Sequence, residues 1–140
     1  MAFQALYAWD MAEKGDKKRT LTDLLELSWL EDDKRQSLGD TADFSRLLIS
    51  GAVENSEAVD TMIRGHLDRW DFSRLNRVDR ALLRLAVYEL LYQTAPPTVI
   101  IDEAVAISRL YGTDDSYRFI NGVLDGVRKA IQLSAEKERP

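Results

Sequence analysis

The sequence of 140 residues contains no cysteine, only one histidine and only three prolines. Without cysteine the chain forms neither disulfides nor thiolate metal sites, which fits a reducing compartment. It has no run of about 18 uncharged apolar residues for a membrane span, and its opening residues lack the basic start of a signal peptide. We therefore expect a soluble, cytoplasmic protein. The length favours one domain over residues 1–140, with helical halves at about 1–67 and 68–140.

Groups that carry catalysis are also scarce. His66 lies far in sequence from any nucleophile or cluster of metal ligands, so we expect a surface or hinge histidine. The carboxylate pairs join sequence neighbours, which do not face each other on a helix. No phosphate loop, dinucleotide fingerprint or metal-ligand spacing appears. We predict that the protein is not an enzyme and needs no cofactor or metal. The carboxylate pairs are Asp32-Asp33, Asp102-Glu103 and Asp114-Asp115.

Positive charge is in deficit, since the net charge is −5. This balance is unfavourable for nucleic-acid binding, which depends largely on Lys and Arg side chains that contact phosphates. The deficit lies in the first half of the chain. Residues 1–67 hold 8 Lys and Arg against 13 Asp and Glu, whereas residues 68–140 hold 11 of each. The second half of the chain can therefore still carry local basic patches.

Apolar residues recur at helical spacing along the chain, and no strand candidate appears. We predict an all-α fold, a compact bundle of about six to seven helices. The most apolar run, residues 80–92, is expected to form a central helix, because its apolar side chains cover about half of a helical wheel and need neighbours on several sides. Further helices are expected at about 2–13, 20–29, 40–67, 98–111 and 115–133.

Several local features are expected to shape these helices. Gly51 and Ala52 favour a close approach between helices, and Asp71 or Ser73 is suited to capping a short turn before the central helix. Pro96 and Pro97 must interrupt a helix, because proline lacks the backbone N–H donor. A stop is expected at Gly112, followed by capping of the last helix through Thr113 or Asp114.

Separated motifs carry a family resemblance that covers nearly the whole chain. They are QALY at 4–7, VDRALLRLAVYEL at 78–90, IDEAV at 101–105, YG at 111–112 and, after Ser116, FINGVLD at 119–125. In this order they resemble the NusB family of small helical bacterial transcription antitermination factors. The family commonly has Asn where this chain has Asp102, a near-isosteric change that keeps a hydrogen-bond acceptor.

The resemblance implies a function in assembly rather than catalysis. Family members bind boxA-type RNA jointly with NusE, a small ribosomal subunit protein, and join an RNA polymerase complex that acts on ribosomal RNA transcription. An arginine-rich segment normally precedes the QALY motif and contributes to RNA binding, whereas residues 1–3 lead straight into it here. A longer natural start and weaker RNA binding both remain open. The RNA-binding candidates carried over by position are Gln4, Tyr7, Ser116, Tyr117, Arg118 and Phe119.

The start of the last helix has two interpretations by chemistry alone. Its unpaired backbone N–H groups attract phosphate, and its aromatic rings offer a surface for base stacking. The same pattern is typical of plain packing, with Phe119 in the core and Tyr117 beside Arg118 on the surface. Asp115 borders this segment, and its charge is expected to repel phosphate while it stabilises the helix start.

Arg77, Arg80 and Arg84 share one face of the central helix. Contact with phosphate, pairing with acids of neighbouring helices, and docking of a protein partner are all open, and we favour the last two. The resemblance implies that NusE binds the second helical half. Asp79, Arg80 and Arg84 are therefore the nominated contributors, with Arg84 the one expected to be structural.

Two other classes of function remain open. Domains similar to the NusB family occur at the front of ribosomal RNA methyltransferases, although this chain carries no cofactor-binding fold. The second alternative is a protein-interaction module that has lost RNA binding. A homodimer that covers the RNA surface is a further state that the sequence leaves open.

Overall fold

The structure is a computed structural model that describes residues 2–11, 47–67 and 71–137. Within these ranges every regular element is a helix, which confirms the all-α prediction. The helix expected at 20–29 lies outside the described residues. The elements are α1 (Ala2–Met11), the helical residues 47–54, α4 (Ser56–Arg64), the 3₁₀ helix η1 (Phe72–Arg74), α5 (Arg77–Tyr92), α6 (Pro97–Tyr111) and α7 (Ser116–Lys137).

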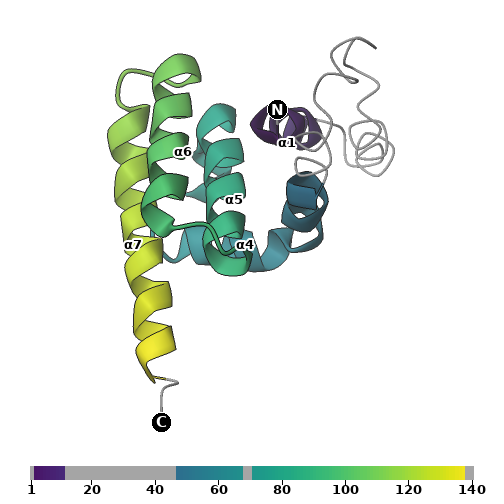
Figure 1. Ribbon diagram of the computed structural model, residues 1–140. Coiled ribbons are helices and arrows are strands. Elements are labelled where there is room, and N and C mark those ends of the chain that lie inside the picture. Colours follow the sequence, from purple (N-terminus) through teal and green to yellow (C-terminus); the bar gives the residue numbers. More distant parts are fainter. Residues whose placement is uncertain (1, 12–46, 68–70, 138–140) are drawn as a thin grey trace.

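Helix α5 is the central element, as its apolar pattern predicted. It packs against α1, α4, α6 and α7, so elements from both predicted halves of the chain meet on it (Figure 1). Its start is set by Asn76, whose side chain accepts hydrogen bonds from the backbone N–H groups of Val78 at 2.8 Å and Asp79 at 3.1 Å. The sequence interpretation missed this cap.

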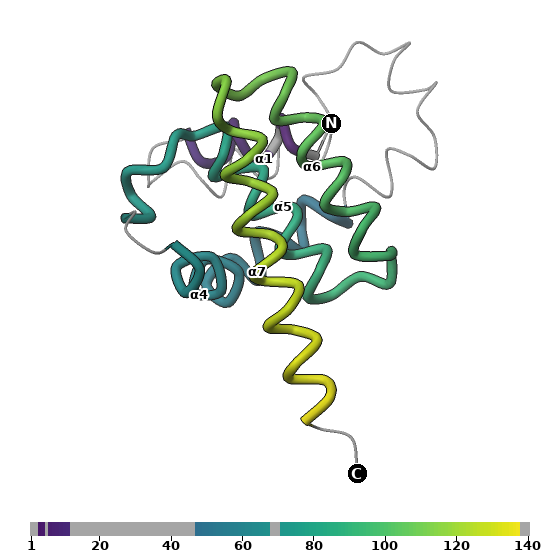
Figure 2. The backbone as a smooth tube through the Cα atoms, turned by 90° about the vertical axis from the view of Figure 1, so that its left-hand side faces the viewer, coloured from purple at the N-terminus to yellow at the C-terminus, as the bar shows by residue number. Residues whose placement is uncertain are grey.

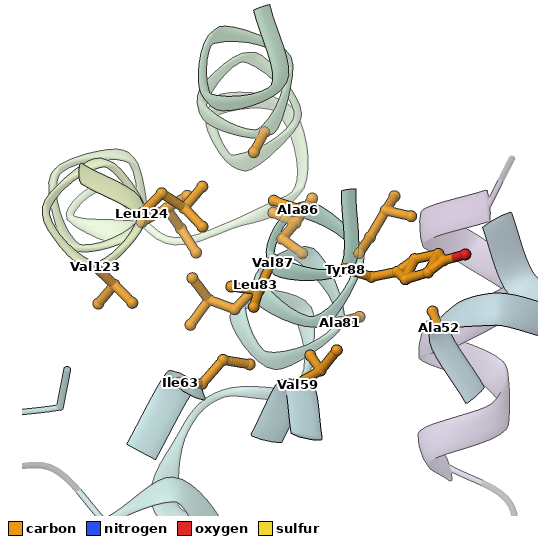
Figure 3. Packing of buried hydrophobic residues seen from close by; sticks show 14 of the residues in the cluster. Ala52, Val59, Ile63, Ala81, Leu83, Ala86, Val87, Tyr88, Val123 and Leu124 are labelled. Carbon is orange, nitrogen blue, oxygen red and sulfur yellow. The ribbon is translucent and has the colours of Figure 1, made fainter. Parts of the chain in front are cut away.

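The core lies where α4 and α7 pack on either side of α5. Figure 3 shows Leu83 and Val87 of α5 between Leu124 of α7 and the α4 residues Val59 and Ile63. All five side chains are fully buried. Burial of one large aliphatic side chain contributes about 1.5–3 kcal/mol, so this contact holds α4 and α7 to the same central helix.

The single helix predicted up to Leu67 is wrong in one respect, because the chain turns at Asn55 before α4 begins. The Asn55 side chain donates a hydrogen bond to the carbonyl oxygen of Gly51 at 2.8 Å, and its backbone has φ −105° and ψ 17°. A side chain that bonds to the backbone competes with helical geometry. Helix α4 then runs across one end of the bundle (Figure 1).

The close approach expected at Gly51 and Ala52 is present. A Cβ atom added at Gly51 would lie 2.0 Å from the hydroxyl oxygen of Tyr88, so only glycine leaves room for that ring. Ala52 is buried beside it. Figure 3 shows the Tyr88 ring pointing from α5 toward the helical segment that carries Ala52.

Most of the predicted boundaries in the second half are confirmed. Asp71 accepts a hydrogen bond from the Ser73 backbone N–H at 3.2 Å and caps η1. Pro97 opens α6, and Gly112 follows its last residue. Helix α7 continues to Lys137, beyond the predicted end at Leu133, and its last turns extend past the rest of the bundle (Figure 2). Among the described helices none is long and apolar enough to cross a membrane.

Candidate nucleic-acid interface

The turn between α6 and α7 is held by Ser116, whose side chain is buried. Its hydroxyl oxygen accepts a hydrogen bond from the Thr113 backbone N–H at 2.9 Å and lies 3.1 Å from the Thr113 hydroxyl. A Cβ atom added at Gly112 would lie 2.6 Å from that oxygen, so the turn is tightly packed. Ser116 therefore shapes the turn, and its side chain has no accessible surface to offer an RNA strand.

The Tyr117 ring contacts two guanidinium groups. The Cζ atom of Arg109 is 4.8 Å from the centre of the Tyr117 ring, and that of Arg118 is 5.4 Å from it. Arg118 Nε also donates a hydrogen bond to the Tyr117 hydroxyl at 2.8 Å. A cation and the face of an aromatic ring attract each other, and guanidinium groups form hydrogen bonds with phosphate. We call Arg109, Tyr117 and Arg118 the arginine–tyrosine cluster.

Sequence reasoning missed Arg109 because it stands on α6, in a different motif from Tyr117. The signal was its place in the last turn of that helix, before the stop at Gly112. A hollow beside the turn is lined by both Arg109 and Tyr117, together with Thr113 and Asp114. Two positive charges and an aromatic ring therefore meet at one open place of the surface.

Helix α1 reaches the same end of the molecule through its first turn. The rings of Phe3 and Tyr111 lie 5.7 Å apart, which places the start of α1 beside the end of α6 (Figures 1 and 2). Gln4 is exposed, whereas Tyr7 is half-buried against the core. The structure thus brings the two predicted RNA-binding segments to one end of the molecule, with Tyr111 between them.

Phe119 and Asp79 meet at a pocket between the starts of α5 and α7. Phe119 is half-buried, and Asp79 is 8% exposed. Burial raises the pKa of the Asp79 carboxyl, and a hydrogen bond with the Ser116 side chain offsets only part of this effect. Asp79, expected at a protein interface, thus lies inward from the surface, next to the turn that carries the RNA-binding candidates.

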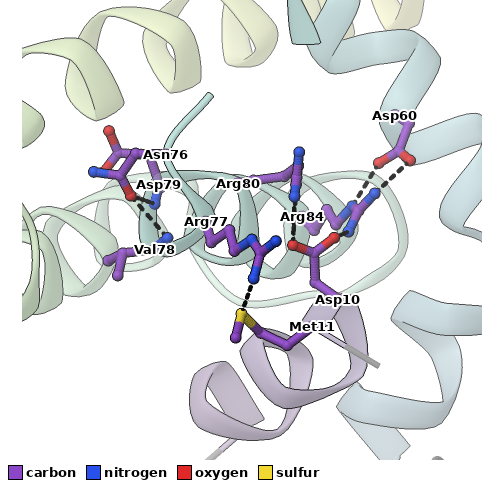
Figure 4. A network of polar contacts seen from close by, with 9 residues as sticks. All are labelled: Asp10, Met11, Asp60, Asn76, Arg77, Val78, Asp79, Arg80 and Arg84. Carbon is purple, nitrogen blue, oxygen red and sulfur yellow. Dashed lines mark hydrogen bonds and ion pairs between the residues drawn. The ribbon is translucent and has the colours of Figure 1, made fainter. Parts of the chain in front are cut away.

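Arg80 and Arg84 pair with acids of neighbouring helices (Figure 4). Arg84 donates hydrogen bonds to Asp60 on α4 at 2.9 and 3.0 Å and to Asp10 on α1 at 2.8 Å. Arg80 donates to Asp10 at 2.5 Å and 3.2 Å. The side chains of Arg80 and Arg84 are only 14% and 11% exposed. Arg77, the third member of the stripe, is exposed and contacts the Met11 sulfur.

The pKa values of this network follow from its contacts. Burial alone raises the pKa of Asp10, but the hydrogen bonds and charges of Arg80 and Arg84 outweigh it and leave the pKa below its ordinary value. Burial alone lowers the pKa of Arg84, and the contacts with Asp60 and Asp10 reverse that shift. Both groups are charged at neutral pH, so the network is ionic.

No catalytic centre is visible in the described part of the chain. His66 is half-buried, with Nδ1 2.9 Å from the carbonyl oxygen of Met62, a contact within its own segment. Groups of three or more metal-ligating side chains are absent from the same residues. The site with the strongest chemistry is therefore the α6–α7 turn, and the fold is that of an all-helical protein with a basic aromatic surface at one end.

Comparisons with known proteins agree with the sequence resemblance. The model of the NusB family matches residues 1–129. The transcription antitermination protein NusB of Treponema pallidum (strain Nichols) is 49% identical over 131 residues, which cover 93% of this chain and 89% of that protein. The NusB protein of Carboxydothermus hydrogenoformans is 42% identical over 134 residues, 94% of this chain and 90% of its own.

Solved structures show the same fold. NusB of T. maritima superposes with a TM-score of 0.75 at 35% identity, over 91% of this chain and 85% of that one. A chain from the crystal structure of the antitermination factors NusB and NusE in complex with dsRNA has a TM-score of 0.72 at 28% identity, over 92% and 91% of the two chains. The chain belongs to the NusB family. Because members are named as transcription antitermination proteins, membership supports the prediction that the chain is not an enzyme.

Proposed function

We propose that this protein is a transcription antitermination factor that binds boxA-type RNA jointly with NusE. It joins an RNA polymerase complex in the cytoplasm and acts on ribosomal RNA transcription. The observation that carries the proposal is the arginine–tyrosine cluster at the α6–α7 turn of a NusB-family chain. The structural relative described with NusE and dsRNA supports both proposed partners.

The RNA surface runs from α1 across the end of α6 to the start of α7. Arg109 and Arg118 supply positive charge for phosphates, and Tyr117 and Phe119 offer rings for unpaired bases. Gln4 and Tyr7 extend the surface on α1, as the resemblance implies. Ser116 contributes by holding the turn in shape, because its hydroxyl is already engaged with Thr113. Ser116 therefore has a structural role in this surface, unlike the residues proposed to contact RNA.

NusE is proposed to bind the second helical half. Of the nominated residues Asp79, Arg80 and Arg84, Arg80 offers the largest exposed fraction, 14% of its side chain. Arg84 supports the surface by tying α5 to α1 and α4. A homodimer that covers the RNA surface would compete with RNA, so the proposal includes an RNA-free dimer as a competing state.

The test is binding of a boxA-containing RNA and of a scrambled control, at two salt concentrations, with and without NusE. Specific binding that NusE strengthens is expected. Binding equal to the scrambled control would leave a protein-interaction module as the function. Repeating the assay with an N-terminally extended chain separates that outcome from the need for a longer start.

A double variant tests the arginine–tyrosine cluster directly. Arg109→Ala with Arg118→Ala is expected to weaken binding of all RNAs and to reduce the salt dependence of binding. Each phosphate contact that is lost lowers the number of counterions that the RNA releases on binding. Lys137→Ala is the matched control, because this exposed cation lies at the opposite end of α7. An equal loss in the double variant and in the control would place the RNA elsewhere.

A further inference from the structure

The outer face of α6 carries large apolar side chains that no other described helix covers. Helix α6 packs on α5 and α7 through its opposite face, where Ile101, Ala104 and Ser108 are buried. Figure 2 shows α6 along one edge of the bundle. On the outer face Leu110 is 77% exposed and Val99 is 46% exposed. Single exposed apolar residues are ordinary, whereas several in line mark a contact surface.

The exposed residues of this face follow the spacing of helix packing. Val99, Glu103, Ala106 and Leu110 are all exposed and are separated by steps of four, three and four residues. At 100° per residue these positions fall within about 60° of one another, so they form one narrow stripe. Alternating steps of three and four are the pattern by which two helices pack along their length. Ala106, near the middle of the stripe, leaves room for a second helix to approach.

The charges beside the stripe are self-complementary. Asp102 and Arg109 are both exposed and lie on the same edge of the stripe, seven residues apart. In an antiparallel pair of α6 helices that cross near Ala106, this edge meets the same edge of the other helix. Asp102 of each copy then lies opposite Arg109 of the other, and twofold symmetry makes the ion pair twice. The apolar ends of the stripe, Val99 and Leu110, meet in the same way.

We propose that α6 is the contact surface of a homodimer in which two copies of this chain pack their α6 helices antiparallel. Val99 of each copy packs against Leu110 of the other, and Asp102 pairs with Arg109. The occupant of the face is a second copy, because a stripe with an acid near one end and a base near the other fits its own reverse. The inference does not rest on the proposed RNA binding. It also differs from a dimer that covers the RNA surface, since it involves neither α1 nor the start of α7.

Glu103 limits the strength of this dimer. It lies on the other edge of the stripe, where antiparallel packing brings it near Glu103 of the second copy. Like charges at such a contact oppose association. The face is also small, because α6 has 15 residues in all, whereas a standard interface uses about 20–30 residues on each side. We therefore expect a weak dimer that forms at high protein concentration.

Sedimentation velocity measures the dimer of this chain at concentrations up to about 1 mM, where a weak interface becomes populated. The wild type is expected to shift from monomer to dimer as the concentration rises. Ala106→Glu places a charge at the centre of the stripe and is expected to abolish the shift, while circular dichroism shows that the fold persists. Leu133→Glu is the matched control and should keep the shift, since Leu133 is a 58% exposed apolar residue of α7.

Two neighbouring carboxylates separate this geometry from a general effect of net charge. Asp102→Asn and Glu103→Gln each remove one negative charge from a chain whose net charge is −5. Asp102→Asn is expected to weaken the dimer about threefold or more, because both ion pairs lose a partner. Glu103→Gln is expected to strengthen it by about the same factor, because a repulsion is removed. A shift of both variants in the same direction contradicts the antiparallel arrangement.

A charge exchange is the decisive test. Asp102→Arg and Arg109→Asp are each expected to stay monomeric, because each variant places like charges opposite one another. An equimolar mixture of the two is expected to form a heterodimer, since every pair is again of opposite sign. The readout is mass rather than RNA binding, because Arg109 also belongs to the arginine–tyrosine cluster.

Two results overturn the inference. One is a wild type that stays monomeric at every concentration, which would leave this face of α6 to a different protein. The other is a mixture of the exchange variants that stays monomeric under conditions in which the wild type dimerises. Specific boxA binding in the same preparation would still leave the proposed function standing.

Discussion

Arg84 on α5 donates two hydrogen bonds to the carboxylate of Asp60 on α4, from Nε to Oδ1 at 2.9 Å and from a terminal nitrogen to Oδ2 at 3.0 Å. Its second terminal nitrogen donates to Asp10 on α1 at 2.8 Å. The planar guanidinium group fits such a bidentate contact. One side chain therefore joins three helices that are far apart in sequence.

Arg84→Ala is expected to lower the free energy of unfolding by about 3 kcal/mol, because it leaves Asp60 and Asp10 largely buried with fewer partners. Urea unfolding measures the change. Arg118→Ala removes an exposed guanidinium group and its contacts with Tyr117, and should cost no more than about 1 kcal/mol. If both variants lost the same stability, the buried network would not be what joins α1 and α4 to α5.

Glu89 predicts a dependence of stability on pH. Burial, together with the charge of Glu103, raises the pKa of the Glu89 carboxyl from 4.5 to about 7. The folded state thus binds more protons than the unfolded state between these values, so this group makes stability fall as pH rises from 4.5 toward 7. At higher pH the half-buried Glu89 carboxylate is charged in the folded protein, which lowers the free energy of unfolding.

Glu89→Gln mimics the protonated form and should remove that cost. The variant is expected to be more stable than the wild type by about 2 kcal/mol at pH near 8 and to differ little at pH near 4. Urea unfolding at the two pH values measures the difference, and Glu57→Gln, on the exposed surface of α4, is the control. A gain of the same size at both pH values would show that the pKa of Glu89 is not raised.

Gly51→Ala tests the contact with Tyr88. The added Cβ atom would lie 2.0 Å from the hydroxyl oxygen and 2.3 Å from the ring carbon that bears it, so the Tyr88 ring or the helices must shift, at a cost of about 1–3 kcal/mol. Gly122→Ala on α7 is the matched control, since nothing lies within 4 Å of its added Cβ. That control should stabilise the protein by roughly 0.5–1 kcal/mol. Thermal unfolding of the two variants should therefore shift in opposite directions.

Asp115→Asn tests the charge beside the proposed RNA surface. Asp115 is exposed just before the first residue of α7, where a negative charge repels phosphate. The variant is expected to bind RNA several-fold more tightly at low salt, and the gain should shrink as salt screens the charge. Glu136→Gln, exposed near the far end of α7, is the control. Unchanged affinity of Asp115→Asn at low salt would count against RNA at this turn.

Local features of the fold were predictable because they depend on neighbouring residues. The apolar coverage of residues 80–92 predicted a helix surrounded on several sides, and α5 is that helix. Pro97, Gly112 and Asp71 mark boundaries through their own backbone or side-chain chemistry. The break at Asn55 was missed, since the apolar spacing continues through it while its amide bonds to Gly51.

The candidate site was predictable only in part. Sequence motifs pointed to the start of α7, but Arg109 belongs to another helix, and its contact with Tyr117 depends on how α6 packs on α7. The resemblance made Ser116 an RNA-binding candidate, yet packing against the turn and Asp79 buries its side chain. The depth of a side chain depends on the neighbouring helices.

The sequence by itself determined most of the described helices, the central place of α5 and the membership of the NusB family, since each of these depends on local periodicity or on ordered motifs. Tertiary structure alone decided which charges pair and which remain at the surface. Arg84 meets Asp10 and Asp60 across 74 and 24 residues of chain, whereas Arg109 and Arg118 flank Tyr117 at the open turn. The physical reason is that pairing and burial depend on distances between helices, which only the packing of the core around α5 sets.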